Sequence, residues 1–80
     1  MKILNKPVKV MAIFYTDGKI EPVKFRLDGK VVRIDRVVKA YEEHFVGNVR
    51  VVFMCIQNEK VTYELKYELE SCVWWLSFHL

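Results

Sequence analysis

The chain has 80 residues, of which 52% are apolar and 29% are charged, and these proportions exclude a disordered or low-complexity protein. We expect one small domain over residues 1–80, because a chain of this length supports only one modest core. Thirteen Lys and Arg against ten Asp and Glu give a net charge of +3, which permits an anionic partner without indicating one. No apolar run suits a membrane span or a signal peptide. The sequence therefore predicts a cytoplasmic protein that does not associate with a membrane.

The first half of the chain alternates between strand-like runs and turn dipeptides. Residues 8–15 are apolar on both faces, which is typical of a covered strand. Asp17-Gly18 then predicts a two-residue type I′ hairpin, because both residues tolerate a positive φ. In the next strand, residues 20–27, Pro22 has no N–H to donate and so indicates a sheet edge or a bulge.

A second Asp-Gly dipeptide, Asp28-Gly29, repeats the hairpin signal and leads into a third strand from Val31. The segment 36–46 that follows has two interpretations. With Asp35 as N-cap and Gly47 beyond the end, it is a short helix. With a bulge at Arg36 or a neighbour, the third strand continues as a long, bent strand. We favour the strand, and an α+β fold with a helix at 36–46 is the alternative.

Three further strands complete the chain. Residues 49–57 are apolar on both faces, residues 61–68 alternate between apolar and polar side chains, and residues 72–80 place Trp74 inward. We therefore predict an all-β fold in which about six antiparallel strands form a meander. The sheet is expected to curl into a small SH3-like barrel, because closure removes exposed strand edges.

The two cysteines are predicted to be free thiols. In the meander, Cys55 lies beside Thr62 and Cys72 lies beside Glu68, at opposite ends of the sheet. A separation of about 20 Å follows from the rise per residue of a strand, well beyond the reach of a disulfide.

Residues with catalytic or metal-binding patterns are absent from the sequence. It contains no Ser-His-Asp elbow, phosphate-binding loop or metal-ligand spacing. We therefore predict no enzymatic activity, no catalytic residue, no metal site and no cofactor.

Two groups of residues are candidate interaction sites. Consecutive strand residues point to opposite faces, so with Trp74 inward, Trp75 faces outward beside Val73. Either another segment of the chain covers this apolar pair or a partner does, and the pair is a possible interface. Lys24, Arg26, Arg33 and Arg36 form a basic majority on neighbouring strands, which suits an anion or nucleic acid. Interleaved acids make an ordinary solvated face the alternative for these cations.

The spacing Phe53-x-Cys55, followed by the run from Tyr63 to Trp74, resembles a family of small uncharacterised bacterial proteins of the low-GC Gram-positive type. The resemblance implies a short cytoplasmic protein of unknown function and supplies no site residue. From the residues themselves, we expect a non-enzymatic module that binds a protein partner or forms a homo-oligomer. The alternative is a small barrel that binds nucleic acid through its basic face.

Overall fold

The computed structural model describes residues 3–79, apart from the side chains of residues 3, 4, 45, 78 and 79. The described chain is all β and contains no helix. Its strands are β1 (Ile3–Pro7), β2 (Lys9–Phe14), β3 (Ile20–Leu27), β4 (Lys30–Arg33), β5 (Arg36–Phe45), β6 (Asn48–Gln57), β7 (Val61–Glu68) and β8 (Trp74–His79). The all-β prediction is confirmed, and the alternative with a helix at 36–46 is wrong.

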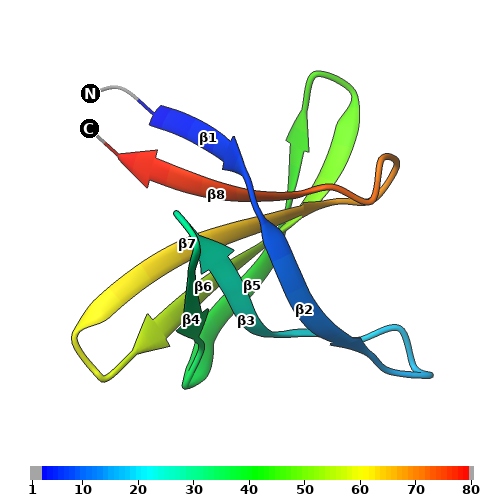
Figure 1. Ribbon diagram of the computed structural model, residues 1–80. Helices are drawn as coiled ribbons and strands as arrows, with labels where there is room; N and C mark the ends of the chain where they lie inside the picture. Colours follow the sequence, from blue (N-terminus) through cyan, green and yellow to red (C-terminus); the bar gives the residue numbers. More distant parts are fainter. Residues whose placement is uncertain (1–2, 80) are drawn as a thin grey trace.

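The strands form two antiparallel sheets, one of five strands in the order β1-β8-β7-β6-β5 and one of three in the order β2-β3-β4. Within each sheet, strands that follow one another in sequence are neighbours, as a meander requires. The pairing of β1 with β8 is the exception, and it brings the two ends of the described chain together (Figure 1). The eight strands exceed the predicted six because 3–7 pairs as a strand and because the third strand breaks at Ile34-Asp35.

The two sheets are joined at two points where the chain crosses between them. At the first, between β1 and β2, the backbone N–H of Val8 donates to the carbonyl of Trp74 at 3.1 Å. At the second, between β4 and β5, the N–H of Ile34 donates to Val23 and the N–H of Asp35 donates to Ile56, each at 2.9 Å. No pairing between β3 and β5 closes the described strands into one continuous sheet.

Two β-bulges fall where the sequence indicated irregularity. In β5, Val37 lies opposite Cys55 and Lys39 lies opposite Met54, so Val38 is an extra residue. The bulge was predicted at Arg36 or a neighbour, and it lies two residues beyond Arg36. In β3, a register shift between Met11 and Ala12 of the partner strand leaves Val23 as the extra residue beside Pro22. Pro22 lies beside this bulge and also on a stretch of β3 that has only β2 as a neighbour, because β3 pairs with β4 only over Lys24–Leu27.

The conformation of each hairpin turn depends on the length of its loop as well as on its residues. Asp28 and Gly29 have φ values of 49° and 80°, as a type I′ turn requires. Asp17-Gly18 does not form the predicted type I′ turn. There only Gly18 has a positive φ, and its N–H donates to the carbonyl of Tyr15 at 3.0 Å, which is the three-residue loop with glycine in the left-handed position.

The core lies between the two sheets. Phe25 and Val32 of the three-stranded sheet pack against residues of β6, β7 and β8, among which Leu65 and Leu76 are almost fully buried. Aromatic rings extend this contact, since Phe25 meets Tyr63 at 5.1 Å and Tyr67 meets Trp74 at 4.8 Å between ring centroids. The inward placement of Trp74 is confirmed.

Both cysteines are free, as predicted. Cys72 is exposed, and its N–H donates to the carbonyl of Glu68 at 2.9 Å. Cys55 is buried opposite Tyr63, one residue from the predicted Thr62. Burial raises the pKa of the Cys55 thiol to about 12, because desolvation disfavours the thiolate.

The native protein should therefore present one reactive thiol at neutral pH, and the unfolded protein two. Cys72 is accessible, whereas Cys55 is both shielded and held as the unreactive protonated thiol. Titration with a chromogenic thiol reagent, with and without denaturant, counts them. Cys72→Ala should leave no rapidly reacting thiol in the native state, and two rapid equivalents in the native wild type would contradict the burial of Cys55.

The turn between β5 and β6 contains a strained residue. Val46 has a φ of 49° and is 86% exposed, and Gly47 follows with a φ of 80°. A β-branched residue rarely adopts a positive φ, whereas asparagine does so readily in a type I′ turn.

Val46→Asn should therefore raise the free energy of unfolding by about 1 kcal/mol. Chemical denaturation followed by circular dichroism measures the change. Asp28→Asn, at the equivalent position of the β3–β4 turn, is the matched control and should have little effect. A Val46→Asn variant no more stable than wild type would show that the strain is absent in solution.

Candidate nucleic-acid interface

The register of the three-stranded sheet decides which side chains share a face. Val10 lies opposite Phe25, and Phe25 lies opposite Val32. Phe25 and Val32 are 2% and 8% exposed and belong to the core. Since neighbouring residues of a strand alternate between faces, the residues on either side of this row point away from the core.

The outward-pointing residues form two cross-strand rows that together make the basic face. In the first row Lys9 lies opposite Arg26, which lies opposite Val31. In the second row Met11 lies opposite Lys24, which lies opposite Arg33. Two of the cross-strand pairs, Lys9 with Arg26 and Lys24 with Arg33, therefore join like charges.

The four cations of the basic face have no ion pair with an acid among the described residues. The cations that do form ion pairs there are Lys6, Arg36, Arg50 and Lys66. Like charges directly opposite one another destabilise a sheet by a few tenths of a kcal/mol each. An anion bound over the basic face would relieve this repulsion.

One acid does lie beside the basic face. Asp35 lines a hollow of about 380 Å³ together with Lys24 and Arg33. Its carboxylate accepts a hydrogen bond from the backbone N–H of Asn58, which ties it to the turn after β6. Among the described residues, Asp35 forms no ion pair with Lys24 or Arg33.

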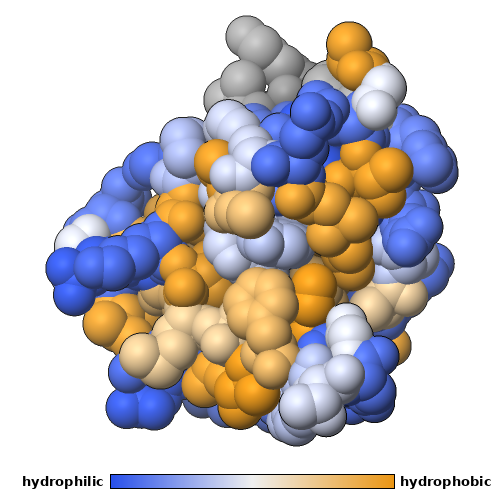
Figure 2. All heavy atoms as spheres, turned by 90° about the vertical axis from the view of Figure 1, so that its right-hand side faces the viewer, coloured by the Kyte–Doolittle hydropathy of each residue, from blue (hydrophilic) through white to orange (hydrophobic). Residues whose placement is uncertain are grey.

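Exposed apolar side chains lie between and beside the cations of the basic face. Met11 and Val31 are 57% and 51% exposed within the basic face, and Ile13 of β2 and Tyr15, which follows β2, are also exposed. Figure 2 shows a broad hydrophobic area bordered by hydrophilic residues on the side of the molecule where β2 lies. The surface thus combines positive charge with exposed apolar area.

The charge of the chain is unevenly distributed along it. Residues 1–34 carry eight Lys and Arg against three Asp and Glu, whereas residues 35–80 carry five against seven. The net positive charge of the protein therefore belongs to the part of the chain that contains the three-stranded sheet.

The structure brings together three of the four cations expected from the sequence, namely Lys24, Arg26 and Arg33. Arg36 lies on β5, where its guanidinium forms two hydrogen bonds with the Glu59 carboxylate at 3.1 and 3.0 Å. Lys9 takes the fourth place, and sequence reasoning missed it. The hairpin register was the available signal, because it places residue 9 opposite residue 26.

The other candidate pair, Val73 and Trp75, is half-buried. Trp75 lies between Lys66 of β7 and Pro7 of β1 in the five-stranded sheet. The guanidinium of Arg50 sits 5.9 Å from the centre of its ring, within the range of a cation–π contact. The chain itself thus gives Trp75 partial cover, and a role in an interface stays a prediction.

Ion pairs surround Trp75 on this face of the five-stranded sheet. Lys66 Nζ lies 3.1 Å from a carboxylate oxygen of Glu43 and 3.5 Å from one of Glu64. Arg50 Nε lies 3.3 Å from Glu68. The alternation of apolar and polar residues in 61–68 predicted that the polar ones, including Lys66, face solvent. Lys66 is only 7% exposed.

Lys66→Ala should lower the free energy of unfolding by about 3–5 kcal/mol, because it leaves two partly buried carboxylates without their cation. Chemical denaturation measures the loss. Lys60→Ala removes the same charge from an exposed turn and should cost less than about 0.5 kcal/mol. Equal stabilities of the two variants would mean that water replaces the ammonium group.

Among the described residues, no three His, Cys, Asp or Glu side chains gather as metal ligands, and no helix is long and apolar enough to cross a membrane. The resemblance to uncharacterised bacterial proteins stays a prediction. Comparison of the chain with protein-family models, with curated proteins and with solved structures gives no match.

Proposed function

We propose that this protein is a small, incompletely closed β-barrel that binds single-stranded nucleic acid through its basic face. The observation that supports the proposal is the pair of cross-strand rows in which Lys9, Lys24, Arg26 and Arg33 lie together without an acidic partner among the described residues. Phosphates spaced along a strand would supply the missing negative charges. Such binding needs no catalytic residue and no cofactor.

A single strand suits this surface better than a duplex. Reading a duplex requires an element that enters the major groove, usually a helix or a two-stranded ribbon. The described fold has no helix, and the cations lie across the face of a three-stranded sheet. Proteins that bind single strands combine a basic track with side chains on which unpaired bases rest. Met11, Val31 and Tyr15 offer this exposed area between and beside the cations.

Tyr15 is the aromatic member of this surface. Its hydroxyl donates to the Glu21 carboxylate at 3.2 Å. The phenol of Tyr15 is uncharged at neutral pH, and the negative charge of Glu21 raises its pKa further. An uncharged ring held by a hydrogen bond provides a stable stacking surface.

Fluorescence anisotropy with a labelled single strand of about 16 nucleotides tests the proposal. Each phosphate contact on a single strand contributes about −0.7 to the slope of log K against log salt concentration, so four cations predict a slope of about −3. A duplex of the same sequence should bind more weakly. Absence of binding at low salt would refute the proposed function.

The double variant Lys24→Gln/Arg33→Gln should reduce the salt slope to about −1.4, because two phosphate contacts are lost. Lys39→Gln/Lys60→Gln removes the same total charge from β5 and the β6–β7 turn and is the matched control. The control should keep a slope near −3. Equal losses in both variants would show that net charge, rather than the basic face, controls the binding.

A further inference from the structure

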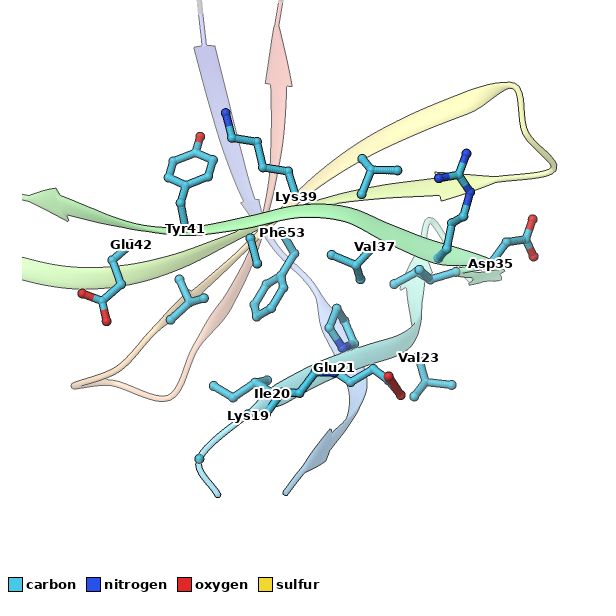
Figure 3. Close-up of a pocket in the computed structure, with 17 residues that line it drawn as sticks. Lys19, Ile20, Glu21, Val23, Asp35, Val37, Lys39, Tyr41, Glu42 and Phe53 are labelled. Carbon is cyan, nitrogen blue, oxygen red and sulfur yellow. The ribbon is translucent and has the colours of Figure 1, made fainter. Parts of the chain in front are cut away.

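A groove of about 810 Å³ lies between β3 and β5, on the open side of the fold. One wall is formed by residues 18–23 and the other by residues 34–42, while Val51 and Phe53 of β6 line its base. Figure 3 shows Val37 of the β5 wall and Phe53 of the base directed into the space between the two strands. None of the basic-face cations lines it.

Both walls are strand edges without a neighbour on the groove side. β3 pairs with β4 only over Lys24–Leu27, and Val23 accepts a hydrogen bond from the N–H of Ile34, so Ile20–Pro22 is the stretch of β3 that has only β2 beside it. β5 has β6 on one side and no described strand on the other. Backbone N–H and C=O groups along an unpaired edge are a template for an added strand.

The dimensions suit one short strand. Residues 36–42 of β5 line the groove, and with Val38 as the extra residue of a bulge they extend about 20 Å at about 3.3 Å per residue. This is the length of a strand of five or six residues, the commonest in proteins. A single added strand would hydrogen-bond to β5 and would connect the two sheets.

The chemistry of the lining favours a peptide over an anion. Ile20, Val23, Val37 and Phe53 supply apolar contacts, whereas the charged residues carry both signs. Those charged residues are Lys19, Glu21, Asp35, Arg36, Lys39 and Glu42. Pro22 has no N–H, which leaves β5 as the wall with the fuller set of backbone donors.

The bulges of the two sheets face this groove. Val23 and Val38, the extra residues of β3 and β5, both line it. Bulges on edge strands twist the edge away from flat pairing with another sheet, and they are common beside functional sites. Beyond Val38, the register of β5 is regular from Lys39 to Phe45, so this stretch remains competent for pairing.

We infer that the groove binds an extended segment of a partner protein by β-strand addition, with apolar side chains at alternate positions directed toward Phe53 and Val37. A slot with walls on both sides admits one strand and excludes an edge strand that brings its own sheet. The occupant is therefore unpaired in its free state. The folded strands of a second copy do not meet this condition, because each described strand already has a neighbour.

This inference concerns a different surface from the proposed function and does not depend on it. It gives the expected protein-interaction role a location that the sequence did not indicate. Lys24→Gln/Arg33→Gln should leave peptide binding unchanged, so the two activities can be lost separately.

Selection from a random peptide library displayed on phage, with the full chain as bait, provides the probe. Enriched peptides should share apolar residues at alternate positions. A synthetic peptide of this sequence is then titrated by calorimetry into wild type and into Ala40→Trp, which fills the groove from β5. We expect at least a tenfold loss of affinity in the variant. Thr62→Trp, on an exposed position of β7 outside the groove, is the matched control and should bind as wild type does.

A backbone readout keeps the test valid if Ala40→Trp fails to fold. Amides within residues 36–42 should gain protection from hydrogen exchange when the peptide is added to wild type. Peptides with N-methyl groups at one set of alternate positions should lose binding, and those with the other set methylated should keep it, because only one set of N–H groups faces β5. Each of these results would support strand addition.

Three outcomes would overturn the inference. The first is a library that yields no enriched peptide, and the second is a peptide that binds without protecting residues 36–42. The third is a concentration-dependent dimer of the wild type, seen by light scattering, that Ala40→Trp abolishes. That last result would assign the groove to a second copy of this chain.

Discussion

The structure depends on two consecutive backbone hydrogen bonds that point in opposite directions. The N–H of Ile34 donates to Val23 of β3, and the N–H of Asp35 donates to Ile56 of β6. Successive N–H groups of an extended chain face opposite sides, so one dipeptide can belong to both sheets. Beyond this point β5 follows β6 and diverges from β3. The open groove follows directly from this divergence, because neither strand has another partner to fill it.

The same division separates two uses of positive charge. In the five-stranded sheet, Lys66 and Arg50 are almost buried, and carboxylates of the same sheet compensate their charges. A buried ion pair contributes little net stability, but loss of either partner is costly. In the three-stranded sheet, Lys24 and Arg33 lie opposite each other with no such acid. One set of cations therefore belongs to the packing of the fold, and the other set is available to a ligand.

Local patterns in the sequence predicted the features that depend on local physics. Alternating apolar residues identified most strands, and Asp28-Gly29 identified its turn type because both residues accept a positive φ. The interpretation of 36–46 as a strand with a bulge agrees with β5. The type I′ turn predicted at Asp17-Gly18 was wrong because the loop has three residues, and loop length decides which residue takes the left-handed conformation.

Features that depend on distant partners could not be predicted in this way. The pairing of β1 with β8 joins the two ends of the chain, and no local pattern encodes it. Lys66 was expected in solvent because polar residues of a strand usually face outward, whereas Glu43 of another strand shields it. For the candidate site, hairpin register was sufficient to group Lys24, Arg26 and Arg33. Arg36 does not lie with these three cations, because the chain crosses to the other sheet at Ile34.

The central strand β3 carries both candidate surfaces, and its bulge explains how. From Lys24 to Leu27 the strand is paired on both sides, so only its faces are available, and one face presents cations. From Ile20 to Pro22 the strand is paired on one side, so its edge is available as well. The extra residue, Val23, lies at the boundary, and a bulge increases the local twist of a strand. The two halves of β3 therefore present different surfaces, and a ligand on the basic face need not obstruct a peptide in the groove.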